Sequence, residues 1–230
     1  MTHQQMGFST GSLYRAMDTY SQEAIKKIGG LSTDAIEVMC AHAEDIDRLP
    51  AMIPWLTDFK TKSVHLPVNL RYQNTSQVRQ LLGRTSAFYH AIGASLAVLH
   101  PDLVDDWSVF DDSPMNIAIE NMDCRKNSFQ FTDDLSEAFT KHPRLLFVLD
   151  LNHCFSNDPS MALADELMRL FGDRLAEVHI SGFDGKYHSP LFRANQPQIL
   201  DHLPETDCPI IIESPCDFDE LAQEISYIRQ

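Results

Sequence analysis

Residues 146–153 read LFVLDLNH, a run of four apolar residues that ends in an aspartate, with a histidine three positions further on. Short apolar runs that end in polar residues recur along the whole chain, at GFST from Gly7, AIEVMC from Ala35, SVHLPV from Ser63, SLAVLHP from Ser95, NIAIEN from Asn116, EVHISG from Glu177 and PIIIES from Pro209. Most of these eight runs start about 30 residues apart, which is the length of one strand and one helix. Their continuous hydrophobicity is typical of parallel strands that are buried on both faces.

Segments with helical character separate these runs. The segment 21–30 ends on Gly-Gly, and the amphipathic stretch 75–94 begins at Thr75 and ends near Gly93. Segments 134–142, 159–172 and 217–228 have similar periodicity, whereas 102–115 is short, acidic and at most a turn or two of helix. Strand and helix repeated eight times predict an α/β fold, a (β/α)8 TIM barrel, as a single domain over residues 1–230. An open doubly wound sheet is disfavoured because no Gly-rich phosphate loop follows the first strand.

Composition limits the partners of this chain. Lys and Arg number 18 against 33 Asp and Glu, for a net charge of −15, so nucleic acid is an unlikely partner. The five cysteines include no CxxC pair, and the first ten residues lack the pattern of a signal peptide, which together predict a reduced, cytoplasmic protein. The apolar runs are too short to span a membrane, and a homo-oligomer is compatible with the sequence.

Polar residues that can bind metal stand at the ends of the predicted strands. They are His65, His100, Glu120, Asp150 with His153, His179 and Glu213, and Asp184 and His188 follow in the loop after the seventh strand. In a barrel these ends meet on one face, and buried, unpaired charges there would be costly without a cation. The mixture of carboxylates and imidazoles predicts one to three divalent transition-metal ions, with Zn or Mn preferred.

The segments FSTGSLY, DAIEV, VHLP, IGASLAVLHP, IAIENMD, LDLNH, EVHISG and IIIES together resemble the xylose isomerase-like TIM-barrel superfamily. That group includes AP endonuclease family 2 and many sugar isomerases and epimerases. The resemblance implies a four-ligand metal centre at Glu120, Asp150, His179 and Glu213.

The resemblance also gives expected roles to the remaining histidines. His65 and His100 resemble the ligands that complete a multi-metal cluster in endonuclease IV. His153 matches a residue that lies near the substrate in epimerases and binds an additional metal in the endonuclease. Asp184 and His188 resemble the last ligand pair of that enzyme, but three residues separate them here, where the endonuclease has one.

Two activities are compatible with these residues. A sugar or sugar-phosphate isomerase or epimerase would act through an enediolate, with Glu120 and Glu213 as catalytic acid and base. An endonuclease IV-like hydrolase would instead use several metal ions on a phosphoester, and this activity makes fuller use of the histidines. The acidic charge and the lack of a long basic loop favour the isomerase and a small-molecule substrate. A barrel that binds metal and sugar without turnover is the third possibility.

Four basic residues in the predicted loops are candidates to bind a phosphate or carboxylate of a small sugar or sugar phosphate. They are Arg125, Lys126, Lys186 and Arg193, and His153 is expected to join them. Solvated loop charges are an equally good interpretation of Arg125 and Lys126.

Overall fold

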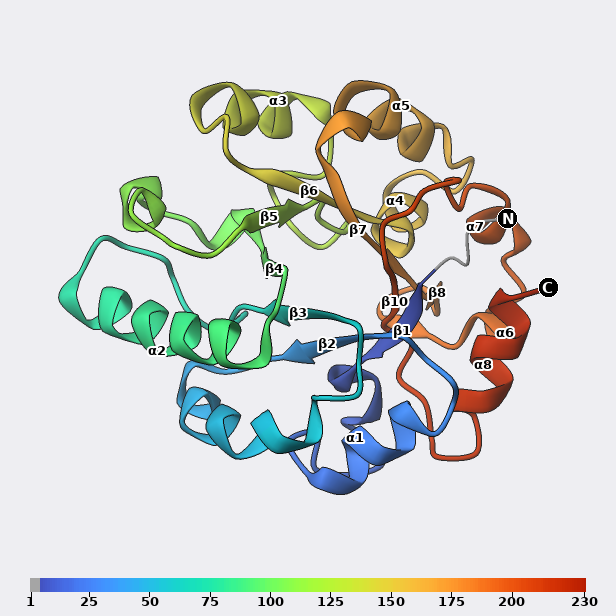
Figure 1. Cartoon of the computed structure of the whole chain (residues 1–230). Coiled ribbons are helices and arrows are strands. Elements are labelled where there is room, and N and C mark those ends of the chain that lie inside the picture. Colours follow the sequence, from blue (N-terminus) through green and yellow to red (C-terminus); the bar gives the residue numbers. More distant parts are fainter. Residues whose placement is uncertain (1–4) are drawn as a thin grey trace.

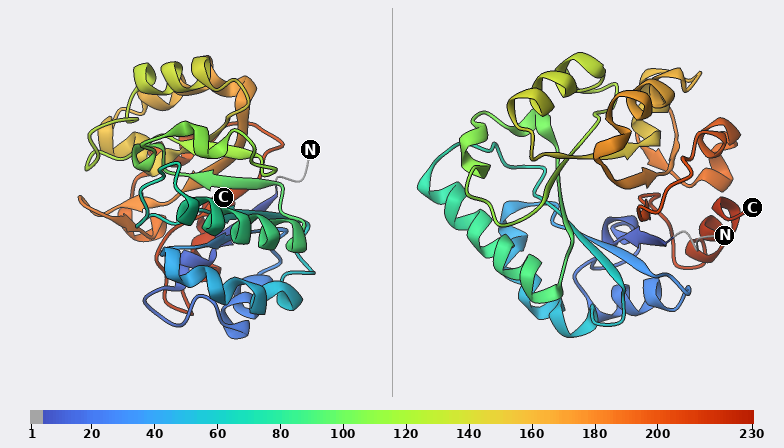
Figure 2. Two further views of the ribbon diagram at one scale, coloured as in Figure 1. Left: turned by 90° about the vertical axis from the view of Figure 1, so that its left-hand side faces the viewer. Right: turned by 45° about the horizontal axis from the view of Figure 1, so that its top comes forward.

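Eight parallel strands close into a barrel in this computed structural model, which describes residues 5–230. Neighbouring strands pair in chain order, in the sequence β1-β10-β7-β6-β5-β4-β3-β2, and helices surround them (Figure 1, Figure 2). The predicted (β/α)8 TIM barrel is therefore confirmed. Residues 1–4, which begin the segment where we expected no signal peptide, lie outside the described residues.

Each barrel strand overlaps one of the eight apolar runs, although β3 and β7 begin two residues before theirs. The strands are β1 (Met6–Ser9), β2 (Ala35–Met39), β3 (Thr61–His65), β4 (Leu96–Leu99), β5 (Ile117–Glu120), β6 (Leu146–Asp150), β7 (Leu175–Ile180) and β10 (Ile210–Ile212). A short antiparallel hairpin, β8 (Gly182–Phe183) with β9 (His188–Ser189), stands in the loop after β7 and was not predicted from the sequence.

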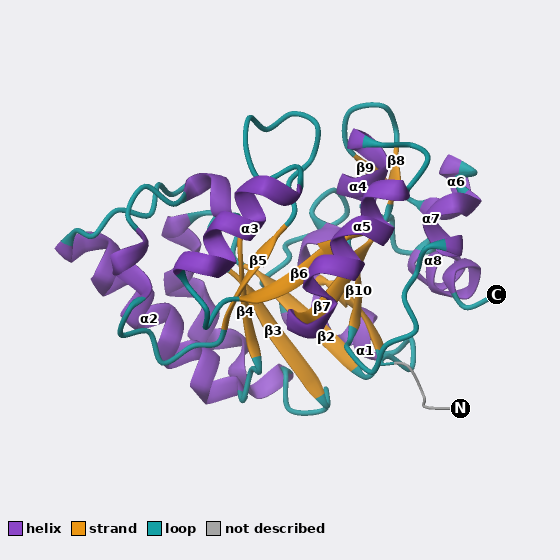
Figure 3. Cartoon of the chain, turned by 90° about the horizontal axis from the view of Figure 1, so that it is seen from above, coloured by secondary structure: helices purple, strands orange, loops and turns teal. Residues whose placement is uncertain are grey.

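The helical layer is less regular than the barrel it covers (Figure 3). Its α-helices are α1 (Gln22–Gly29), α2 (Ser76–Ile92), α3 (Thr132–Lys141), α4 (Leu151–Asn157), α5 (Ala162–Phe171), α6 (Leu191–Ala194), α7 (Pro197–Asp201) and α8 (Leu221–Ile228). Its 3₁₀ segments are η1 (Thr10–Leu13), η2 (Ala43–Trp55), η3 (Pro101–Leu103), η4 (Trp107–Phe110) and η5 (Gly172–Arg174). Pro50 and Pro54 lie inside η2, where they remove backbone donors that an α-helix needs. No described helix is long and apolar enough to cross a membrane.

Side chains along each strand alternate between the barrel interior and the surrounding helices, because successive residues of a strand point to opposite faces. Val98, Ala118 and Val148 belong to a small apolar cluster that is separate from the main core under the helices. Two residues beyond Ala118 and Val148, the same alternation brings Glu120 and Asp150 to the interior at the C-terminal ends of β5 and β6. The interior beside β4, β5 and β6 is therefore apolar in mid-strand and becomes polar at the end where catalytic groups lie in this fold.

The first strand fits against its neighbour only because residue 7 is glycine. A Cβ atom at Gly7 would lie 1.8 Å from the carbonyl oxygen of Ala35, with which it is in register. At the end of the strand, the hydroxyl of Ser12 donates to the carbonyl of Ile212, at 2.9 Å. This contact anchors the first βα loop beside the end of β10 and so next to Glu213.

The sixth strand is shorter than predicted. We expected Asp150 and His153 both to close it, but the strand ends at Asp150 and His153 lies in the first turn of α4. The cause is a helix cap: Oδ1 of Asp150 accepts a hydrogen bond from the backbone N–H of His153, at 2.8 Å. The helical turn still directs His153 toward the same end of the barrel, because its ring nitrogen Nδ1 lies 3.4 Å from Oε1 of Glu120.

Candidate metal centre

Glu120 lies at the centre of the polar group at the C-terminal end of the barrel. Its side chain is 1% exposed, and its two oxygens face different histidines. Oε2 lies 3.2 Å from Nε2 of His100 and 3.8 Å from Nε2 of His65. Oε1 lies 3.4 Å from Nδ1 of His153 and 3.4 Å from Nδ1 of His179. A carboxylate with imidazoles on both of its oxygens is well placed to be shared between two cations.

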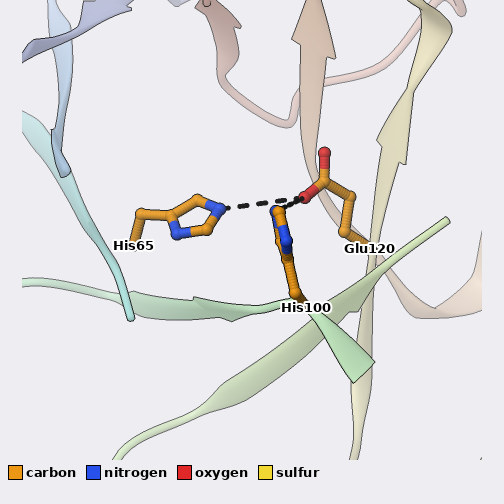
Figure 4. Close-up of side chains that lie close together, drawn as sticks. All are labelled: His65, His100 and Glu120. Carbon is orange, nitrogen blue, oxygen red and sulfur yellow. Dashed lines mark ion pairs between the residues drawn. The ribbon is translucent and has the colours of Figure 1, made fainter. Parts of the chain in front are cut away.

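His65, His100 and Glu120 form the first group that could hold a metal ion. Figure 4 shows the rings of His65, from β3, and of His100, which directly follows β4, directed at the same oxygen of Glu120. Nδ1 of His65 donates to the carbonyl oxygen of Leu66, at 2.9 Å, so Nε2, which faces Glu120, is the nitrogen that a cation would bind. A backbone partner of this kind is typical of metal-binding histidines.

Glu120 also belongs to a second group, with Asp150, His179 and Glu213. Nδ1 of His179 lies 3.4 Å from Oε1 of Glu120 and 3.5 Å from Oε1 of Glu213. Asp150 reaches the group because β6 and β7 pair with Asp150 opposite His179. Ligand atoms of all four residues lie within 4.8 Å of one another, so the structure brings together the four residues that the sequence suggested.

Asp150, His153 and His188 form a third group. Nε2 of His153 and Nε2 of His188 lie 3.3 Å apart. The carbonyl of Asn121 accepts from Nδ1 of His153, at 2.8 Å, which leaves the lone pair of His153 on Nε2. Nδ1 of His188 lies 2.9 Å from the hydroxyl of Ser181, which leaves Nε2 of His188 facing Nε2 of His153. Either a proton on Nε2 of His188 or a cation can lie between these two nitrogens.

Asp184, by contrast, is not part of this third group. Its Oδ1 accepts hydrogen bonds from the backbone N–H groups of Lys186 and Tyr187, at 2.8 and 2.7 Å. The carboxylate therefore shapes the turn of the β8–β9 hairpin. The structure brings only His188 of this suggested pair to the centre.

Buried polar atoms of the centre lack hydrogen-bond partners among residues 5–230. They are both oxygens of Glu120, Oδ2 of Asp150, and Nδ1 of His100 and of His179. Burying such groups unpaired costs several kcal/mol each, and divalent cations bound to the carboxylate oxygens and to Nδ1 of His179 would remove that cost for these atoms. Imidazoles mixed with carboxylates fit Zn or Mn better than Ca or Mg. The residues present therefore fit the metal ions that the fold implies.

The carboxyl groups of the centre differ in their affinity for protons. Burial by itself would raise the pKa of Glu120, but the surrounding imidazoles, His153 first, hold it well below its usual range. Burial raises the pKa of Glu213 to about 7, and the charges of Glu37 and Glu120 add to that effect. Burial also raises the pKa of Asp150 well above its ordinary value. Two carboxyl groups of the second group thus keep protons that a metal ion would displace.

Two buried glutamates next to the centre escaped the sequence analysis. Oε1 of Glu177, on β7, lies 3.1 Å from Nε2 of His179 and accepts from the hydroxyl of Ser63, also at 3.1 Å. Oε2 of Glu37, on β2, lies 3.5 Å from the same nitrogen of His179. The alternation of side chains along a strand could have revealed both glutamates. Glu177 stands two residues before His179 and therefore lies on the same face of its strand, and Glu37 is a charged residue within an apolar run.

A cavity of about 430 Å³ opens above the centre. Its walls include Met39, His65, Val68, His100, Asp123, Arg125, Lys126, His153, His188 and Glu213. Nε and Nη2 of Arg125 donate to the two oxygens of Asp123, at 3.0 and 2.5 Å, and the guanidinium lies over the ring of Tyr187. Residues 5–230 offer the side chain of Arg125 no other hydrogen-bond partner, so its remaining N–H groups are available to a ligand.

The other candidate substrate-binding cations lie in different surroundings. Lys126 borders the cavity with its Nζ 2.8 Å from Oδ2 of Asp102. Arg193 pairs with Glu220 and is 59% exposed, and neither Arg193 nor Lys186 lines the cavity. The structure therefore brings Arg125 and Lys126 to the centre and places Lys186 and Arg193 outside it.

Solved structures with the same fold are enzymes of several kinds. Endonuclease IV from Thermus thermophilus matches with a TM-score of 0.73 at 13% identity, over 98% of this chain and 97% of that one. The probable 3-DHS dehydratase involved in petrobactin synthesis from Bacillus anthracis matches with a TM-score of 0.71 at 12% identity, over 99% of both chains. A D-allulose 3-epimerase from Methylomonas sp. matches with a TM-score of 0.66 at 18% identity, over 100% of this chain and 98% of that one.

No family model and no curated protein matches this chain. The structural matches therefore establish its fold, a TIM barrel shared with endonuclease IV, with D-allulose 3-epimerase and with a protein that contains a xylose isomerase domain, which is the fold that the resemblance implied. Because the matching structures carry out different reactions, the fold does not select one of them.

Proposed function

We propose that this chain is a metal-dependent hydrolase of small phosphoesters that uses at least two ions sharing Glu120. The observation that carries the proposal is the placement of His65 and His100 on one oxygen of Glu120, with His179 on the other. A single-ion isomerase has no need for the first group. The geometry therefore favours the activity that the composition had placed second.

The ions, when bound, would lower the pKa of a water molecule and neutralise phosphoryl oxygens. His65, His100 and Glu120 would hold one, and Glu120 with Asp150, His179 and Glu213 another. The third group can add a further ion between His153 and His188.

A phosphoester also suits the basic side chains of the cavity. Arg125 is fixed by Asp123 and by the ring of Tyr187, so its free N–H groups point from a rigid support. Arginine in such a setting binds phosphate or carboxylate oxygens with little loss of side-chain entropy. We propose that Arg125, assisted by Lys126 and His153, binds a non-reacting anionic group of a small substrate such as a sugar phosphate.

A sugar isomerase or epimerase is the second candidate. The observation in its favour is Glu213, which lines the cavity and whose pKa burial raises to about 7, a suitable value for proton transfer. Against it stands Glu120, which the paired-glutamate mechanism needs as its second proton carrier. Its carboxylate is enclosed by four imidazoles, and its low pKa makes it a poor base.

Metal counting combined with two substrate assays separates these candidates. We expect at least two Zn or Mn ions per chain in protein purified without chelator, and metal-dependent release of p-nitrophenol from its phosphate mono- and diesters. Hydrogen exchange beside the carbonyl of ketoses in deuterated water, with one ion per chain and no phosphoester cleavage, would favour the isomerase. Protein that neither holds nor takes up these ions would refute both enzymes.

Two glutamate variants make the assay specific to the centre. Glu120→Gln should lose metal and phosphoester cleavage together, because an amide is a poorer ligand and cannot serve two ions. Glu137→Gln is the matched control, since Glu137 is 64% exposed on α3 and pairs only with Lys141 among the described residues. Equal loss in both variants would show that the assay reports stability instead of metal binding.

A further inference from the structure

The imidazole of His179 is held between two sets of carboxylates that face its two nitrogens. Nδ1 faces Glu120 and Glu213 of the second metal group, at 3.4 and 3.5 Å. Nε2 faces away from that group, toward Glu177 at 3.1 Å and Glu37 at 3.5 Å. His179, Glu37, Glu120 and Glu177 are buried, and Glu213 is partly exposed, at 15%.

The carboxylates on the Nε2 side cannot be explained by contacts with the rest of the chain. Neither oxygen of Glu37 has a hydrogen-bond partner among residues 5–230. Glu177 has Ser63, whose hydroxyl donates to the same Oε1 that faces His179. Keeping two glutamates fully buried beside one nitrogen costs stability, so their position points to a role at that nitrogen.

We infer that Glu177, assisted by Glu37, is a positioning residue that keeps a proton on Nε2 of His179 and thereby makes Nδ1 the metal-binding nitrogen. A neutral imidazole carries one N–H, and a carboxylate acceptor at Nε2 fixes it there. The negative charge also makes the opposite nitrogen a stronger donor to a cation. Ser63 orients the accepting oxygen of Glu177, and Glu37 brings a second carboxyl group to the same nitrogen.

This arrangement depends on the register of the barrel. Glu177 and His179 share one face of β7, and Ser63 pairs with Glu37 across β2 and β3. The polar layer formed by Glu37, Ser63 and Glu177 therefore lies one step deeper in the barrel than the metal groups, and its groups reach His179 from below.

The test is the metal affinity of Glu177→Gln, measured by competition with a chromophoric chelator using Zn²⁺. We expect affinity at the second group to fall by roughly 10- to 100-fold, as for other outer carboxylates of histidine ligands. Ser63→Ala should give a smaller loss of affinity, since the carboxylate remains.

The tautomer of His179 gives a second, independent readout. In Zn-loaded wild-type protein labelled with ¹⁵N-histidine, the spectrum of His179 should show the proton on Nε2 and the metal on Nδ1. A proton on Nδ1 would overturn the inference. An unchanged Zn²⁺ affinity in Glu177→Gln, with a lower melting temperature of the metal-free protein, would also overturn it and assign Glu177 a structural role.

The inference rests on the proposed metal centre, and the two can fail separately. Wild-type protein that binds no Zn²⁺ would refute both. Wild-type binding that Glu177→Gln leaves intact would refute only the role of Glu177. Loss of one whole ion per chain in Glu37→Gln, with the other ions held at wild-type affinity, would also overturn the inference, because Glu37, Glu177 and His179 would then be a cation site themselves.

Discussion

Replacing His100 by alanine tests whether Glu120 serves two metal ions. Nε2 of His100 lies 3.2 Å from Oε2 of Glu120, and its loss leaves the first group with only His65 and that oxygen. The second group keeps all four of its ligands. We therefore expect the metal content to fall by one ion per chain, and phosphoester cleavage to fall by at least about 100-fold because both ions take part.

The effect of one bound metal ion on the melting temperature can be calculated from the length of the chain. An ion present at about 1,000 times its dissociation constant stabilises the folded state by about 4 kcal/mol. The unfolding entropy of a chain of 230 residues is about 0.5 kcal/mol/K, so each bound ion raises the melting temperature by roughly 8 °C. Metal should therefore stabilise His100→Ala by roughly 8 °C less than it stabilises the wild type.

Calorimetry and elemental analysis on the same samples give both quantities. His90→Ala is the matched control, since His90 lies exposed near the end of α2, away from the centre. A His100→Ala protein with wild-type metal content and turnover would refute the shared-carboxylate reasoning. So would loss of all metal, because the second group does not include His100.

Four further predictions concern Zn²⁺ affinity, the stability of the metal-free protein, substrate binding and nucleic acid. Zn²⁺ affinity should rise by at least about tenfold per pH unit between pH 5 and 7, because the ion must displace the protons that burial keeps on Glu213 and Asp150. The affinity measured over this range tests the prediction, and a flat profile would contradict it. The same raised pKa means that Glu213 destabilises the metal-free protein as pH rises from 4.5 to about 7, where only the unfolded chain has lost the proton. Arg125→Gln should raise KM for substrates with an extra phosphate more than it lowers kcat. Arg193→Gln is the control and should change neither constant, because Arg193 lies outside the cavity. If the two variants had equal effects on KM and kcat, Arg125 would not belong to the substrate site. Binding of abasic-site duplex DNA at physiological salt should be undetectable because the net charge is −15, and metal-dependent nicking would instead support an endonuclease.

The sequence predicted those parts of the structure that depend on local pattern. Apolar runs at regular spacing predicted the strands, and the fixed geometry of a closed barrel then brought His65, His100 and Glu120 to one end. The polar residue within a strand was harder to see. Glu37 lies in the middle of an apolar run, so a search of the strand ends alone did not find it. The alternation of side chains along the strand nevertheless places it on the interior face of the barrel, as it does the residues of the centre.

Loop residues could not be predicted in the same way, because their positions depend on contacts between distant segments. Asp184 and His188 are four positions apart, and only the β8–β9 hairpin decides that one faces the backbone and the other faces His153. Arg125 and Arg193 are equally basic in sequence. They differ because Asp123 and Tyr187 hold the first at the cavity, whereas Glu220 holds the second at the surface.

The buried charges link metal binding to folding. Five carboxyl groups lie inside or at the mouth of the barrel, namely Glu37, Glu120, Asp150, Glu177 and Glu213. Without metal the folded chain can reduce that negative charge only by retaining protons, as the raised pKa values of Asp150 and Glu213 indicate. Unfolding releases all five to water, so repulsion among them favours the unfolded state until cations are bound. The residues that we propose as metal ligands should therefore also make the stability of the barrel depend on bound cations.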